Sequence, residues 1–149
     1  MSRATIESAI TTALAAVSGV QHVVAGRLNK VNPAAFITAY RESDASDIQA
    51  WFVRRVSSPG RAAETPRGRG VIPIRVELWR DHAFTIDAYF SFKDNDSEAR
   101  FQTLIDAVLV AFDNERTLGG FQASMLDLTQ VNDELFGNVA CTHARFQIT

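Results

Sequence analysis

The sequence is poor in cysteine and in long apolar runs, and each shortage excludes a class of protein. Cys141 is the single cysteine of 149 residues, so the chain has no internal disulfide framework and no cysteine-built zinc site. The first six residues are soon followed by Glu7 and lack the continuous apolar core of a signal peptide or membrane span. We therefore expect a protein of the reducing cytoplasm, without membrane contact.

The sequence also lacks an excess of one sign of charge, because 15 Lys and Arg oppose 17 Asp and Glu for a net charge of -2. This balance excludes a strongly basic nucleic-acid binder in bulk. The distribution is uneven. Residues 1–53 sum to zero, residues 54–80 carry seven Arg and two Glu (+5), and residues 81–149 carry eleven acids and four bases (-7). Such asymmetry fits a surface that meets an acidic partner, with two separately solvated faces as the alternative.

Length and composition predict one globular domain over residues 1–149, because 46% of the residues are hydrophobic and 21% are charged. Apolar residues recur at helical spacing near the N-terminus and predict a first helix over residues 3–17. Ser2 is the expected N-cap of this helix, and Gly19 is expected to end it.

Two further helices follow from capping residues and apolar stripes. Asn32 followed by a proline predicts a short helix over residues 34–40. An apolar stripe at helical spacing predicts a second long helix over residues 97–113, capped by Asp96 or Ser97.

The remaining apolar runs indicate strands. Two neighbouring runs that alternate apolar and polar residues fit either one long strand, bulged near Asp81, or two strands. The order of elements predicts an α+β fold, in which two long helices pack against a mixed or antiparallel sheet of about four to five strands. The strands are expected over residues 20–27, 48–56, 72–79, 84–92, 121–128 and 139–148.

Residues 57–70 (SSPGRAAETPRGRG) contain two prolines and no hydrophobic periodicity, and they predict a long, flexible, Arg-rich loop. Five guanidinium groups in and before this loop are suited to bidentate contacts with carboxylates or phosphates. DNA, the acidic rim of a protein, or solvent alone are the open alternatives for what they meet. These candidate partner-binding residues are Arg54, Arg55, Arg61, Arg67 and Arg69.

No set of residues assembles an active site. Cys141 and His143 share one face of the last predicted strand, but residues two apart on a strand lie roughly 6–7 Å apart, too far for a direct hydrogen bond. The glycines at 60 and 68 lack the spacing of a phosphate-binding loop. We therefore expect a structural or binding protein, neither an enzyme nor a cofactor carrier.

Metal sites are not indicated either. The acidic run over residues 94–98 opens like a calcium loop, but Ala99 and Ile105 stand where that loop needs Gly and Glu. Capping of the following helix explains these acids. His22 and His82 have no partner cluster and are expected to be structural.

The C-terminal two-thirds of the sequence resembles the tail terminator (tail completion) proteins of long-tailed bacteriophages and Mu-like prophages. Each matching stretch is a pattern of aromatic, glycine and apolar positions, and it is their order and spacing that carry the resemblance. The Arg-rich loop and the run at residues 72–79 are longer than the family carries. The stretches are WFVR (residues 51–54), DHAFTIDAYF (81–90), EARFQTLIDAVLVAFDNERTLGG (98–120) and LFGNVACTHARFQI (135–148).

The resemblance implies a structural virion protein at the head-proximal end of the tail. Its subunits would close into a ring, as a homohexamer, that stops polymerisation of the tube and offers a surface for head-tail joining. The implied partners are further copies of the chain, the major tail tube protein and the head-tail connector or neck proteins. Phage DNA would pass through the lumen without specific binding. Assembly would take place in the host cytoplasm.

Two other functions stay open on the sequence. A head completion or stopper protein of the neck would use a similar ring of small subunits. A DNA-binding module acting through the Arg-rich loop would require binding that weakens with salt.

Overall fold

The computed structural model describes residues 3–26, 32–42, 47–57, 60–62, 78–80, 82–91, 95–114, 117–118, 121–122, 126–136 and 139–148. The fold is α+β, as predicted. Its helices are α1 (Arg3–Ala15), α2 (Pro33–Tyr40) and α3 (Asn95–Asn114). Its strands are β1 (Val23–Ala25), β2 (Gln49–Ser57), β3 (Gly60–Ala62), β4 (Leu78–Arg80), β5 (Ala83–Ser91), β6 (Thr117–Leu118), β7 (Phe121–Gln122), β8 (Asp127–Phe136) and β9 (Val139–Ile148).

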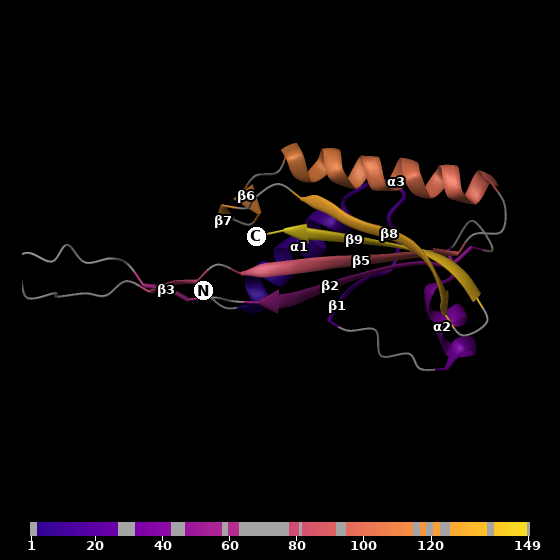
Figure 1. Cartoon of the computed structure of the whole chain (residues 1–149), viewed down its shortest axis with the longest axis horizontal. Helices are drawn as coiled ribbons and strands as arrows, with labels where there is room; N and C mark the ends of the chain where they lie inside the picture. Colours follow the sequence, from indigo (N-terminus) through magenta and orange to yellow (C-terminus); the bar gives the residue numbers. More distant parts are fainter. Residues whose placement is uncertain are drawn as a thin grey trace, which may run out of the picture.

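The main sheet has five strands in the order β1-β2-β5-β9-β8 (Figure 1). β1 runs parallel to β2, and the other neighbours pair antiparallel, so the sheet is mixed. This confirms the predicted sheet of four to five strands. β8 and β1 form its two edges.

A two-stranded ribbon of β3 and β4 continues from the end of β2 and β5 (Figure 1). β4 and β5 are therefore two separate strands rather than one bulged strand. Ser57 ends β2 and Gly60 begins β3, so the segment expected to be a loop starts as strand. Residues 63–70 of the loop expected over residues 57–70, and residues 72–77 of the strand expected over residues 72–79, lie outside the described residues.

The residues predicted to end α1 and to cap α2 are confirmed, and those predicted to cap α3 are not. Gly19 follows α1 with a φ of 89°, which favours glycine. Asn32 caps α2, its Oδ1 accepting a hydrogen bond from the Ala34 amide at 2.9 Å. The expected caps of α3 are wrong: the helix begins at Asn95, so Asp96 and Ser97 lie in its first turn. Ser2 lies outside the described residues.

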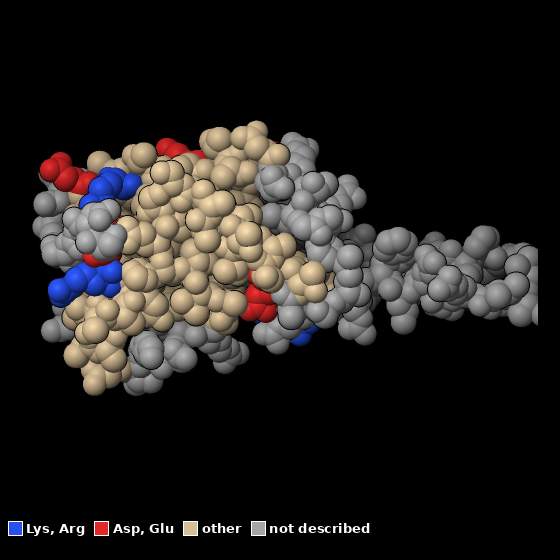
Figure 2. Space-filling model, turned by 180° about the vertical axis from the view of Figure 1, so that it is seen from behind, with Lys and Arg blue, Asp and Glu red and all other residues tan. Residues whose placement is uncertain are grey.

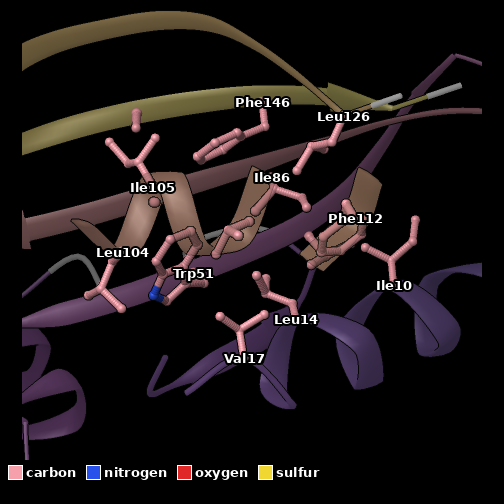
Figure 3. Packing of buried hydrophobic residues seen from close by; sticks show 14 of the residues in the cluster. Ile10, Leu14, Val17, Trp51, Ile86, Leu104, Ile105, Phe112, Leu126 and Phe146 are labelled. Atoms are coloured by element: carbon pink, nitrogen blue, oxygen red, sulfur yellow. The ribbon is translucent and has the colours of Figure 1, made fainter. Parts of the chain in front are cut away.

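The main core lies between one face of the sheet and helices α1 and α3 (Figure 3). Trp51 of β2 and Phe146 of β9 are fully buried and stack at 6.2 Å between ring centroids. Leu14 of α1 and Ile105 of α3 close over them. Both helices therefore pack on the sheet, as their apolar stripes predict.

A smaller core lies where α2 packs against the opposite face. The ring centroids of Phe36 and Tyr40 of α2 lie 5.0 Å apart, and those of Tyr40 and Phe52 of β2 lie 5.5 Å apart. β2 is therefore apolar on both faces, as expected for a strand with helices on both sides. None of the helices in the described part of the chain is long and apolar enough to cross a membrane.

The prediction of a strand over residues 121–128 is wrong. β7 has only two residues there, and the long strand is β8, which pairs with β9. The register of β8 shifts between Leu128 and Gln130, so Thr129 is an extra residue in the strand. Leu128 and Val131 consequently point to the same face, although they are three residues apart, and the alternation typical of a strand is broken.

Replacing Leu14 with alanine should lower the free energy of unfolding by about 3 kcal/mol, because the side chain is fully buried between α1 and the sheet. Urea unfolding followed by circular dichroism measures this change. Ser8→Ala, at an exposed position of the same helix, is the matched control and should stay within about 0.5 kcal/mol of the wild type. Equal losses in the two variants would contradict the packing.

Candidate functional site

The sheet face opposite α1 and α3 carries a network of charged side chains centred on Asp87 of β5. Arg145 Nε of β9 donates to Asp87 Oδ1 at 2.6 Å, and Arg54 Nε of β2 lies 3.4 Å from Asp87 Oδ2. The strand register explains the meeting, because Asp87 pairs directly with Arg145 and Arg54 pairs with Thr85 two residues away. Asp87 is 4% exposed, whereas about a third of each Arg side chain remains exposed.

His143 of β9 extends this network to the edge strand. Its ring nitrogens lie 2.9 Å from Asp87 Oδ1 and 3.0 Å from Glu134 Oε1 of β8. The ring stacks on Tyr89 with a centroid distance of 4.5 Å. Three strands, β5, β9 and β8, are thus tied together by one buried imidazole.

Burial and the contacts of the network shift the pKa values of Asp87, Arg145 and Tyr89. Burial alone would raise the pKa of Asp87, but the hydrogen bonds from His143 and Arg145 outweigh it and hold this pKa below its ordinary value. The hydrogen bond to Asp87 raises the pKa of Arg145. Burial raises the pKa of Tyr89 to about 12. Asp87 is therefore held as a carboxylate between cations.

A second ionic cluster ties α3 to the start of β2. Arg100 Nη2 donates to Glu42 Oε2 at 2.5 Å and lies 3.4 Å from Asp47 Oδ2. The guanidinium group also lies over the Phe90 ring, 5.0 Å from its centroid. Gln49 Nε2 donates to Glu42 Oε1 in the same buried cluster. This arrangement fixes the helix on the sheet.

The five candidate arginines do not gather at one described place. Arg54 and Arg55 lie next to each other near the end of β2, where Arg54 is held by Asp87 and Arg55 is exposed. Arg61 lies in β3. Arg67 and Arg69 lie outside the described residues. The structure therefore places Arg54 in the Asp87 network, whereas Arg55, which pairs with the core residue Phe84, lies on the opposite face of the sheet.

Cys141 is buried and belongs to no catalytic pair among the described contacts. Burial and the nearby Glu134 carboxylate raise the pKa of its thiol to about 11, which is opposite to the shift of an activated nucleophile. His143, the partner considered from the sequence, is held by Asp87 and Glu134 instead.

The histidines of the described chain have structural surroundings. His22 Nε2 lies 2.7 Å from the carbonyl oxygen of Arg41, and the His22 carbonyl accepts from the Trp51 amide at 3.1 Å. The His82 ring lies 6.4 Å from that of Phe84. Within the described ranges, no three His, Cys, Asp or Glu side chains gather as metal ligands would.

The described surface separates charged from uncharged areas. Seen from behind the view of Figure 1, the middle of the molecule shows neither acidic nor basic side chains, and charges lie at its rim (Figure 2). Protein interfaces are depleted of charge at their centres, so such a face suits protein contact. The exposed acids of α3 and β8 are Asp96, Glu98, Asp106, Asp113, Asp127 and Asp133.

Sequence reasoning missed the Asp87 network. His143 and Asp87 are 56 residues apart, and only the register of β5, β9 and β8 brings them together with Glu134. The one signal in the sequence was Asp87 itself, the only charged residue of β5. An acid in that position needs cationic partners on neighbouring strands.

Comparisons with known proteins find similar solved structures. No protein-family model matches the sequence, and no curated protein matches it in sequence. The chain is similar to the sheath/tube terminator of PVC, an extracellular contractile injection system, in its extended state, with 16% identity and a TM-score of 0.49 over 100% of this chain and 55% of that chain. This chain thus spans about half the length of that terminator.

Two gene transfer agent (GTA) structures are also similar. The tail of an empty particle with C6 symmetry matches at 14% identity and a TM-score of 0.30, over 69% of this chain and 75% of that chain. The virion of a native particle matches at 14% identity and a TM-score of 0.29, over 69% and 77%. At TM-scores of 0.49 and below, these likenesses assign no function to the chain.

Asp87→Asn should lower the free energy of unfolding at pH 7 by roughly 3 kcal/mol, because it leaves Arg54 and Arg145 without their carboxylate. Since the pKa of Asp87 is lowered by folding, its contribution is complete above about pH 4 and is lost as the pH falls further. Urea unfolding at pH 7, 5 and 3 measures the difference. Asp106→Asn on the exposed face of α3 is the control, and a difference that stays constant down to pH 3 would contradict the network.

Cys141 should react with iodoacetamide at pH 8 about 100-fold more slowly in the folded chain than in urea, because its raised pKa of about 11 keeps the thiol protonated. Mass spectrometry of timed aliquots measures both rates. Equal rates would indicate an exposed thiolate and reopen a chemical role for this residue.

Proposed function

We propose that the chain is a tail terminator of a phage or phage-like tail. In this proposal the subunits form a ring, expected as a homohexamer, at the head-proximal end of the tail tube. The ring stops polymerisation of the tube and offers the surface on which the head is joined. The chain is then a structural component of the virion and carries out no reaction.

The observation that carries the proposal is that the four stretches of sequence resemblance fall in one packed unit. Residues 51–54 lie in β2, residues 83–90 of the second stretch lie in β5, and residues 98–114 of the third lie in α3. The described part of the last stretch forms the end of β8 and all of β9. β2, β5 and β9 are adjacent in the sheet, and α3 packs on them through the main core. Stretches that match by chance would have no reason to meet in this way.

The surface is suited to the partners that the proposal requires. A closed ring of identical subunits needs two complementary patches on each copy. The described chain offers the exposed Arg55 at one end of β2 and exposed acids on α3 and β8. The uncharged face of Figure 2 is available to the tube protein or to neck proteins.

DNA passes through the lumen in this proposal without specific binding. The exposed acids of α3 support this assignment, because like charges repel and the phosphate backbone carries one negative charge per nucleotide. The free chain should accordingly bind DNA weakly. Tight, salt-dependent binding through the arginines would instead favour the DNA-binding module.

Electron microscopy of tails assembled with and without the chain tests the proposal. Because an uncapped tube continues to add subunits, overlong tubes are expected in its absence, and tubes of defined length with a terminal ring are expected in its presence. Tails of normal length that lack heads would instead indicate a neck protein. The Leu14→Ala variant, tested above its unfolding temperature, is the control, because it shows what an unfolded chain does to tube length.

A further inference from the structure

The two edges of the main sheet are unlike in length. β8 has ten residues and pairs only with β9, so its other side is a free edge in the described part of the chain. β1 has three residues and covers only Trp51–Val53 of β2. On the side away from β5, no strand among the described residues pairs with the last four residues of β2, 54–57. Unpaired edges of this kind are templates for pairing with another chain.

The β8 edge is apolar and acidic. Leu128, Val131 and Leu135 are 38%, 44% and 76% exposed. Leu128 and Val131 lie opposite the core residues Phe146 and Ala144 of β9, so they stand on the core side of the sheet, where they remain partly exposed. Asp127 and Asp133 are exposed on the same strand.

The other free edge is basic, with one apolar residue. Arg55 is exposed and Val56 is 49% exposed. Arg54 beside them is held by Asp87 and has about a third of its side chain exposed. Each edge therefore combines apolar area with one sign of charge, and the signs are opposite.

We propose that the β8 edge of one copy pairs with residues 54–57 of β2 in the next copy. The inference rests on the proposed ring and names the surfaces that close it. Opposite charges on paired strands attract, whereas pairing like edges would bring acids against acids or arginines against arginines. Because the two edges lie on opposite sides of one sheet, the contact is head-to-tail, and repetition of it closes a ring or extends a filament.

Two charge-reversed variants test the pairing. The first, Asp127→Lys with Asp133→Lys, makes the β8 edge basic, so both of its edges are basic. The second, Arg55→Glu with Val56→Glu, makes the β2 edge acidic, so both of its edges are acidic. All four positions are exposed, and circular dichroism with urea unfolding checks that both variants fold.

Light scattering from about 10 µM to 1 mM gives the readout. The wild type is expected to exceed 16.4 kDa, each variant alone to stay at 16.4 kDa, and an equal mixture of the two to recover the larger species, with the copies alternating. Asp96→Lys and Arg41→Glu, at exposed positions away from both edges, are the matched controls and should assemble like the wild type.

Other outcomes overturn the pairing. A wild type that stays at 16.4 kDa, or a mixture that stays monomeric, removes it. Assembly of the β2-edge variant alone would show that residues 54–57 are not part of the contact, and it would also remove the pairing. Tube length tests the proposed function separately. If the wild type and both variants terminate tubes equally well, the proposed function stands and the edge pairing is wrong. If tubes stay overlong in the presence of the wild type, the proposed function is wrong even if the edges pair.

Discussion

The fold depends on covering one broad apolar face of β2, β5 and β9. Trp51, Ile86 and Phe146 on that face are fully buried, and no strand neighbour could shield side chains that stand perpendicular to the sheet. Two long helices supply the cover, and Gly19, after α1, lies so close to Leu104 of α3 that an added Cβ would be 3.0 Å from Cδ2. The opposite face is left for α2 at one end and for charged groups at the other.

Local periodicity predicted most of this arrangement. The last strand, residues 139–148, and the two long helices follow from patterns that neighbouring residues carry by themselves. β8 could not be found in this way, because the extra residue Thr129 changes the phase of its apolar positions. The Asp87 network could not be found either, since strand register decides which distant residues meet. Of the five arginines proposed as an interface, only Arg54 and Arg55 have described side chains.

The charges that looked unremarkable in total have separate tasks in the fold. Asp87 and Glu42 are buried, and they engage Arg145, Arg54 and Arg100 in ion pairs within the subunit. The acids on α3 and β8, and Arg55, remain at the surface. Burying a charge requires partners within the chain, whereas an exposed charge is available to another molecule. Only this second group supports the proposed assembly.

The ribbon of β3 and β4 continues the line of β2 and β5, and this has a mechanical consequence (Figure 1). A pull on the ribbon acts along the strands, at right angles to the hydrogen bonds between β5 and β9. These bonds are loaded together in shear and do not open one after another like a zipper. Tension applied at the ribbon is therefore shared across the centre of the sheet.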